Sequence, residues 1–125
     1  MDTAQFFYRN VIFSKSNNQV YLIDLFNPEE KKTALEGWFG LILILADGQH
    51  TIEELVELLS TKYAGAPPPN LRETILSVLE RMAESKLVMF TDIKTELPYY
   101  LSLPYEQLDV EKAKKLFTED RANIN

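Results

Sequence analysis

Three helical patterns, joined by short turns and followed by a short apolar run, occupy residues 41–90 and constrain the fold more than any other part of the chain. The first pattern ends at the turn dipeptide Asp47-Gly48. The second opens with Thr51-Ile-Glu-Glu54, which fits a capping box, and then repeats apolar residues at helical spacing. A third follows the proline-rich stretch 65–69, and Leu87–Phe90 is then predicted to be a strand. This order is typical of a winged helix-turn-helix.

The segment before these helices is rich in aromatic and β-branched residues. Phe6–Phe13 and Gln19–Phe26 flank the polar stretch Ser14–Asn18, which predicts a β-hairpin. Lys31–Leu35 is predicted to be a third, short strand, and its two lysines suit an exposed sheet edge. We therefore expect an α+β fold with an N-terminal three-stranded antiparallel sheet and three helices.

The chain beyond Thr91 has a different character, so we expect two parts, 1–90 and 91–125. Leu97–Tyr105 combines aromatic residues with two prolines and predicts an extended arm. Asp109 is then expected to cap a short helix with four apolar residues on one side: Val110, Ala113, Leu116 and Phe117. Such an apolar segment must bury itself, and we expect it to pack on its own domain or to form a homodimer with a second copy. A partner enzyme is the third surface available.

Composition argues against several kinds of chemistry. The 125 residues include no cysteine, which excludes thiolate metal sites and cysteine nucleophiles. His50 is the single histidine, and we expect it to be an ordinary turn residue. No phosphate loop or catalytic pair is visible, so we expect no enzyme activity, cofactor or metal. No signal peptide or membrane-spanning run is visible either, which predicts a cytoplasmic protein without a membrane partner.

Winged helix-turn-helix units usually bind DNA through their third helix, where phosphate contacts need lysine and arginine. The chain carries a net charge of −6, and Leu71–Ser85 has two basic and three acidic residues, a net charge of −1. We therefore expect no nucleic-acid partner. A DNA-binding transcriptional regulator is the alternative, and a purely structural subunit is a third possibility.

The third helix carries more apolar surface than one-sided packing needs. One stripe is expected to face the core: Leu71, Ile75, Val78 and Met82. A neighbouring stripe consists of Arg72, Leu76, Leu79 and Ala83. Either the sheet or the arm covers this second stripe, or it lines a groove in which Arg72 meets a carboxylate. An edge strand beside such a helix is suited to capture an extended peptide by strand addition.

The order of these elements over residues 6–90 resembles the PqqD-like domain, also called the RiPP recognition element. The most specific feature is Asp47-Gly48 followed by Thr51-Ile-Glu-Glu-Leu55. Proteins of this family bind the leader of a ribosomally made precursor peptide and present it to a modifying enzyme, often a radical S-adenosylmethionine enzyme. The chain departs from the family before the final strand, where Glu84-Ser-Lys86 stands in place of a glycine turn.

The resemblance implies that the leader adds as a strand to the third strand of the sheet and lies against the third helix. The implied peptide-binding residues on the strand are Lys31, Lys32, Thr33, Ala34 and Leu35. Those on the helix are Arg72, Leu76, Leu79 and Ala83. The function it implies is that of a non-enzymatic peptide chaperone.

Overall fold

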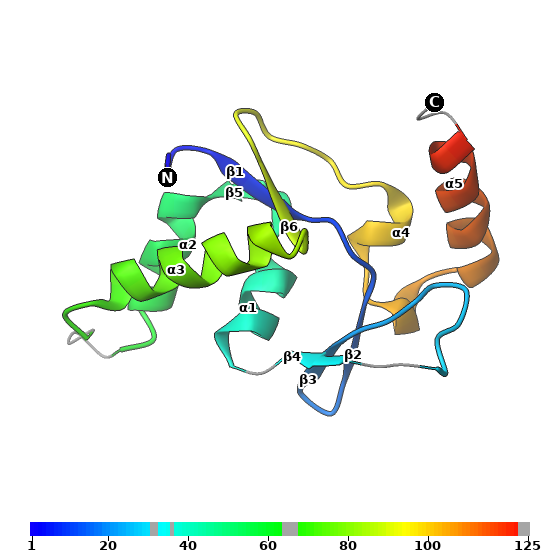
Figure 1. Ribbon diagram of the computed structural model, residues 1–125, viewed down its shortest axis with the longest axis horizontal. Coiled ribbons are helices and arrows are strands. Elements are labelled where there is room, and N and C mark those ends of the chain that lie inside the picture. Colours follow the sequence, from blue (N-terminus) through cyan, green and yellow to red (C-terminus); the bar gives the residue numbers. More distant parts are fainter. Residues whose placement is uncertain (31–32, 36, 64–67, 123–125) are drawn as a thin grey trace. The chain divides into compact units, whose positions relative to one another are not determined.

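The computed structural model describes residues 1–30, 33–35, 37–63 and 68–122, and Figure 1 labels the elements. Contacts group the chain into two compact units, each built from two segments that are distant in sequence. The first unit joins Met1–Asn10 to Leu41–Glu96, and the second joins Val11–Gly40 to Leu97–Asn125. The sequence-based division into 1–90 and 91–125 describes how far a peptide-binding domain extends along the chain, and it stays a prediction.

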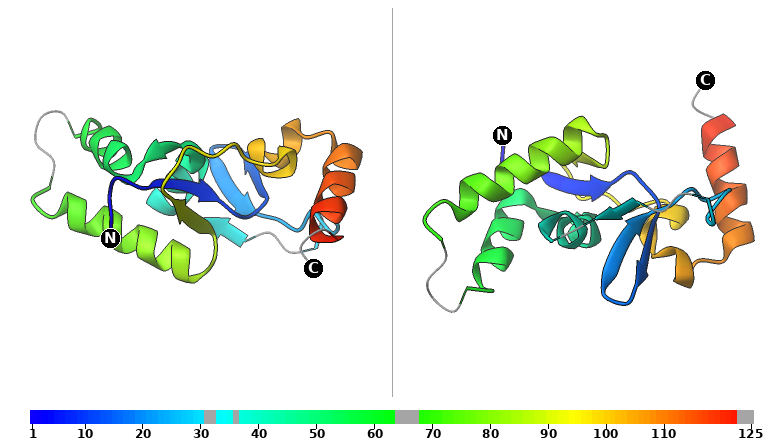
Figure 2. Two further views of the ribbon diagram at one scale, coloured as in Figure 1. Left: turned by 90° about the horizontal axis from the view of Figure 1, so that it is seen from above. Right: turned by 60° about the horizontal axis from the view of Figure 1, so that its bottom comes forward.

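The first unit contains a three-stranded antiparallel sheet in the order β5-β1-β6. The central strand is β1 (Phe6–Arg9), and its neighbours are β5 (Asp47–Thr51) and β6 (Val88–Thr91). The helices are α2 (Ile52–Ser60) and α3 (Leu71–Glu84), which lie side by side in Figure 2. Each helix buries four apolar residues: Ile52, Leu55, Val56 and Leu59 from α2, and Leu71, Ile75, Leu79 and Met82 from α3.

This sheet corrects the expected N-terminal hairpin. Phe6–Arg9 does not pair with the next strand of the chain but with strands about 40 and 80 residues later. The backbone N–H of Asn10 donates to the carbonyl of Leu87, which extends this pairing past the end of β1. Asp47-Gly48 was expected to be a turn, but it begins β5. Local apolar patterning predicts a strand without identifying its partner, and the distant pairing buries Phe7 completely.

The capping box at the start of α2 is confirmed. The N–H of Glu54 donates to Thr51 Oγ1 (3.1 Å), and the N–H of Thr51 donates to Glu54 Oε1 (2.9 Å). At the start of α3 the residue in the N-cap position is Asn70, and its side chain makes no capping hydrogen bond. Instead, the backbone carbonyl of Asn70 accepts hydrogen bonds from the N–H and the hydroxyl of Thr74.

The second unit contains the three-stranded antiparallel sheet that the sequence predicts, in the order β2-β3-β4. The strands are β2 (Phe13–Ser16), β3 (Gln19–Leu22) and β4 (Thr33–Leu35), so the hairpin begins later than expected. The turn consists of Asn17 and Asn18 with φ values of 52° and 63°. Two successive positive φ values define the type I′ turn that suits a tight hairpin. Helix α1 (Trp38–Leu45) follows β4, and the boundary between the units falls within it.

The C-terminal segment is helical where an extended arm was expected. Tyr99–Ser102 forms α4, Tyr105–Gln107 forms the 3₁₀ turn η1, and Val110–Ala122 forms α5. Pro98 and Pro104 directly precede the first two, with φ values of −54° and −62°. Proline suits the start of a helix as well as an extended chain, which explains the wrong prediction.

The same segment packs on its own chain, as expected. Six buried residues form the apolar cluster of the second unit: Ile12, Leu25, Tyr100, Leu101, Leu108 and Ala113. Leu116 and Phe117 of α5 pack against this cluster, and the Phe117 ring makes edge contacts with Phe26 and Tyr100. The N–H of Lys112 donates to Asp109 Oδ1 (3.2 Å), so Asp109 caps α5 as predicted. The α+β class is confirmed, and the finer description as a winged helix-turn-helix stays a prediction.

Candidate functional site

Strand β4 is the open edge of the sheet in the second unit. Among the described residues it has a strand neighbour on one side only, namely β3. Thr33 and Ala34 are exposed, and Leu35 is half-buried. The predicted site residues Lys31 and Lys32 lie outside the described residues.

The register of the sheet indicates which backbone groups face the open side. The Asn17-Asn18 turn makes Ser16 and Gln19 a hydrogen-bonded pair. Opposite pairs alternate along an antiparallel ladder, so the backbone groups of Val20 point away from β2 and towards its partner Leu35. The backbone groups of Ala34, which lies opposite Tyr21, then point away from β3. Ala34 therefore presents its N–H and C=O to the open edge.

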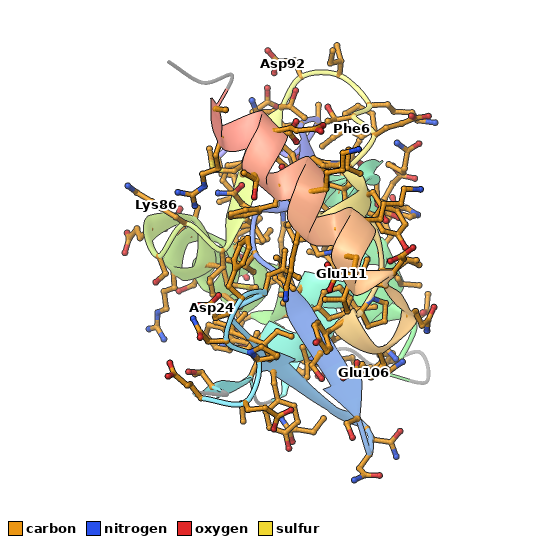
Figure 3. The ribbon with its side chains drawn as sticks, turned by 90° about the vertical axis from the view of Figure 1, so that its right-hand side faces the viewer. Phe6, Asp24, Lys86, Asp92, Glu106 and Glu111 are labelled. Atoms are coloured by element: carbon orange, nitrogen blue, oxygen red, sulfur yellow. The ribbon has the colours of Figure 1, made fainter. Side chains whose placement is uncertain are left out.

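The opposite edge of the same sheet is covered by a side chain. Glu106, which belongs to η1 and is labelled in Figure 3, accepts a hydrogen bond from the backbone N–H of Lys15 at 3.0 Å. Its other carboxylate oxygen accepts a hydrogen bond from the buried Ser14 hydroxyl. The alternation of hydrogen-bonded and non-hydrogen-bonded pairs along the ladder also places the Lys15 N–H on the side of β2 that faces away from β3, in agreement with its hydrogen bond to Glu106. The same alternation places the backbone groups of Ala34 on the open side of β4. Strand β2 is thus less available for pairing than β4.

The end of β4 is held in place by neighbouring residues of the same unit. Gln19 Nε2 donates to the Leu35 carbonyl at 2.8 Å. Gly40 lies against this strand end, since a Cβ at that position would be 3.2 Å from the Leu35 oxygen and 3.2 Å from Val20 Cβ. The backbone of β4 is therefore fixed by close packing before any ligand binds, which lowers the entropy cost of strand addition.

The predicted site residues on α3 belong to the first unit, so they form a separate candidate surface. Leu79 is fully buried and contributes to the core, whereas Val78, expected in the core stripe, is half-buried. Leu76 and Ala83 are half-buried. Arg72 is exposed, and its Nη1 atom pairs with Glu53 Oε2 at 2.6 Å. Leu79 is accordingly left out of the surface that we propose for ligand contact.

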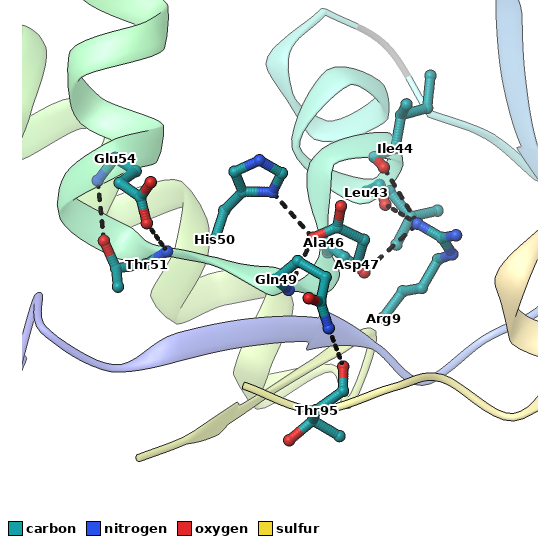
Figure 4. Close-up of polar contacts among 10 residues, drawn as sticks. All are labelled: Arg9, Leu43, Ile44, Ala46, Asp47, Gln49, His50, Thr51, Glu54 and Thr95. Carbon is teal, nitrogen blue, oxygen red and sulfur yellow. Dashed lines mark hydrogen bonds and ion pairs between the residues drawn. The ribbon is translucent and has the colours of Figure 1, made fainter. Parts of the chain in front are cut away.

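Sequence reasoning missed Arg9, which is only 4% exposed. Its Nη1 atom donates to the carbonyls of Leu43 (3.2 Å), Ile44 (3.0 Å) and Ala46 (3.3 Å), as Figure 4 shows. Burial lowers the pKa of the Arg9 guanidinium, and the nearby Asp47 carboxylate opposes that shift. A cation at the last carbonyls of a helix is favourable because the helix dipole is negative there. An arginine at the end of an aromatic strand was the only signal in the sequence.

The Asp47-Gly48 motif has a structural role in the first unit. Asp47 Oδ1 accepts from the N–H of Gln49 (2.9 Å) and lies 2.9 Å from His50 Nδ1. The N–H of Thr95 donates to the Gly48 carbonyl (2.9 Å), and Gln49 Nε2 donates to the Thr95 carbonyl (3.0 Å). His50 thus lies in a strand with a carboxylate partner instead of the expected turn.

The described residues contain no group of three or more His, Cys, Asp or Glu side chains that could hold a metal ion. Within the described ranges, no helix combines the length and the apolar character needed to cross a membrane.

These features define an α+β protein in which β4, among the described residues, is an unpaired edge of its sheet. The sequence model of the family described as coenzyme PQQ synthesis protein D (PqqD) matches residues 25–88, which is more than half of the chain. The chain belongs to the PqqD family. Comparisons with curated proteins and with solved structures find no match. The family match includes β4, α1, β5, α2 and α3, whereas β1 and the C-terminal helices lie outside it.

Proposed function

We propose that this chain is a non-catalytic accessory protein that binds the leader of a ribosomally made precursor peptide and presents it to a modifying enzyme. The observation that carries the proposal is the open backbone of Ala34 on β4, within the stretch that matches the PqqD family. In this family the modifying enzyme is often a radical S-adenosylmethionine enzyme, and we propose the same class of partner here.

The leader would pair with β4 through main-chain hydrogen bonds. Each such bond contributes about 1 kcal/mol net, because the leader gives up hydrogen bonds to water in exchange. Main-chain pairing is largely independent of sequence, so specificity has to come from alternate side chains of the leader. The leader thus needs no defined structure of its own before it binds.

The α3 surface is a second, separately testable part of the proposal. Leu76 and Ala83 offer partly exposed apolar atoms, and Arg72 offers a guanidinium whose present partner is the exposed Glu53. An exposed ion pair is weak, at about 0–1 kcal/mol, so a leader carboxylate can replace Glu53 at little cost. Leu76→Glu should weaken leader binding without disturbing the core, because Leu76 is not fully buried.

The test is isothermal titration calorimetry with the leader segment of the cognate precursor peptide. Ala34→Pro removes the outward N–H, and a proline is tolerated on an edge strand when its nitrogen faces away from the ladder. We expect Ala34→Pro to fold and to bind about fivefold more weakly or worse, which corresponds to the loss of one hydrogen bond of about 1 kcal/mol. Ala34→Val keeps the N–H and should bind the leader like the natural chain. Equal affinity for the natural chain and Ala34→Pro would contradict binding at this edge.

A DNA-binding regulator is the competing function that the helix order suggests. The acidic balance of Leu71–Ser85 opposes it, because phosphate contacts supply most of the affinity for nonspecific DNA. A gel shift at low salt separates the two functions. Tight binding to an arbitrary duplex would contradict the peptide-binding proposal.

A further inference from the structure

The first unit has a pocket of about 350 Å³ that is lined by residues of β1, α1, β5 and α2. Phe7 and Leu55, both buried, form its apolar floor. Leu45 and Leu58 add apolar walls, and Leu58 is 45% exposed. The pocket shares no residue with β4 or with the proposed α3 surface, so it is a separate site.

Two glutamates and one histidine line the pocket beside this apolar floor. Glu54 and Glu57 line the pocket from α2, and His50 lines it from β5. The hydrogen bonds from Thr51 lower the pKa of Glu54, and nearby His50 and Lys94 lower it further. Glu54 is therefore ionised at neutral pH but is already committed to the capping box.

Glu57 differs from Glu54 in that its carboxylate has no hydrogen-bond or ion-pair partner among the described residues. It is exposed and free to meet a cation from outside. Helix α2 contains three glutamates and neither lysine nor arginine, and only Glu53 of the three is paired with an arginine. The negative charge of the glutamates that line the pocket thus favours binding of a positively charged group.

We propose that this pocket docks a large apolar side chain that a partner protein presents next to lysine or arginine. The apolar floor favours burial of an aliphatic or aromatic side chain, and the unpaired Glu57 favours a neighbouring cation. A small metabolite fits less well, because none of the polar residues that line the pocket is buried and able to orient one. The proposal for this pocket does not rest on leader binding at β4.

The test is an amide NMR titration of the full chain with two synthetic peptides, both acetylated and amidated. One is Lys-Leu-Phe-Leu-Lys, and the other is Glu-Leu-Phe-Leu-Glu. We expect the basic peptide to shift amide signals around Leu45, His50 and 54–58, with an affinity at least tenfold higher than that of the acidic peptide. Equal binding of both peptides, shifts confined to other parts of the chain, or no binding would overturn the proposal.

Matched variants make the test specific. Leu58→Ser and Glu57→Gln should each weaken binding of the basic peptide several-fold, and both residues are exposed enough for the fold to persist. Ile93→Ser and Glu80→Gln make the same chemical changes at exposed positions outside the pocket and should leave the affinity unchanged. If the control variants weaken binding of the basic peptide as much as Leu58→Ser and Glu57→Gln do, the proposal is overturned.

Discussion

The backbone oxygen of Thr95 occupies the space that a Cβ atom on Gly48 would need. Gly48 also has a φ of +77°, a value that side chains disfavour. The glycine of the family's most recognisable motif is therefore required by a close approach of two backbone segments in the first unit, and not by chemistry on a ligand.

Gly48→Ala should destabilise the chain by about 3 kcal/mol or more, because positive-φ strain adds to a backbone clash. Gly37 provides a matched control, since its φ is +56° and no atom of the described residues beyond its chain neighbours lies within 4 Å of a Cβ there. Gly37→Ala should cost only the strain, about 1–2 kcal/mol. Urea unfolding of both variants measures the difference, and equal losses would contradict the clash.

At Lys86, in contrast to Gly48, a change to glycine should stabilise the chain. Its φ is +61°, and it follows the end of α3, as Figure 3 shows. The N–H of Lys86 donates to the Ala83 carbonyl and the N–H of Leu87 to the Met82 carbonyl, which together form a Schellman motif. Lys86→Gly should raise the unfolding free energy by about 1 kcal/mol.

Ser85→Gly is the control for that variant, because Ser85 has a φ of −83°. Glycine relieves no strain there and increases the entropy of the unfolded chain, so a small loss of stability is expected. Thermal unfolding of both variants checks the pair. A gain for Ser85→Gly as large as that for Lys86→Gly would contradict the role of the positive φ.

The sequence predicted best what is determined within a few residues of one another. The capping box at Thr51, the cap at Asp109 and the β2-β3 hairpin all depend on local turn and cap chemistry. The turn at Lys86 is also formed by local hydrogen bonds, although the sequence has no glycine there to predict it. Its neighbours enforce the backbone shape even though the residue that suits it best is absent.

What the sequence could not predict depends on distant partners. Nothing near Phe6–Arg9 indicates that it pairs with β5 and β6. On α3, Val78 and Leu79 are adjacent apolar residues on the helix surface, so spacing alone could not decide which of them is fully buried. The edge position of β4 was predicted from the sequence, whereas the outward position of Ala34 required the register, and the role of this edge in binding stays a prediction.

Replacing Arg9 tests whether its buried guanidinium stabilises the C-terminal end of α1. Arg9→Met keeps most of the apolar stem but leaves the carbonyls of Leu43, Ile44 and Ala46 without this donor. Loss of a buried, hydrogen-bonded charge should cost about 3 kcal/mol. Arg81→Met, at an exposed position in the last turn of α3, should change stability by about 0.5 kcal/mol or less. Chemical denaturation of both variants provides the comparison.

Tyr100 should make the second unit sensitive to high pH. Burial, together with the hydrogen bond to Asp120 Oδ2 at 2.7 Å, raises the pKa of Tyr100 to about 12 from 10.0. Because the folded pKa lies above the unfolded one, the stabilisation is complete below pH 10 and is lost as the pH rises to 12. We expect a loss of about 1 kcal/mol from this group after allowing for solvent screening. Tyr100→Phe should show a shallower decline in urea unfolding across the same pH window, and identical slopes would contradict the assignment.

Glu106 should keep β2 from acting as a second open edge. Glu106→Ala would release the N–H of Lys15 and the hydroxyl of Ser14, which both donate to its carboxylate. An uncovered edge strand invites pairing with another chain, so the variant should self-associate at concentrations where the natural chain does not. Sedimentation velocity measures this, with Glu111→Ala as a control because Glu111 is an exposed glutamate in the first turn of α5. Adding Lys15→Pro to Glu106→Ala removes the released N–H and should restore the original mass. Self-association of the double variant would show that the association does not use this edge.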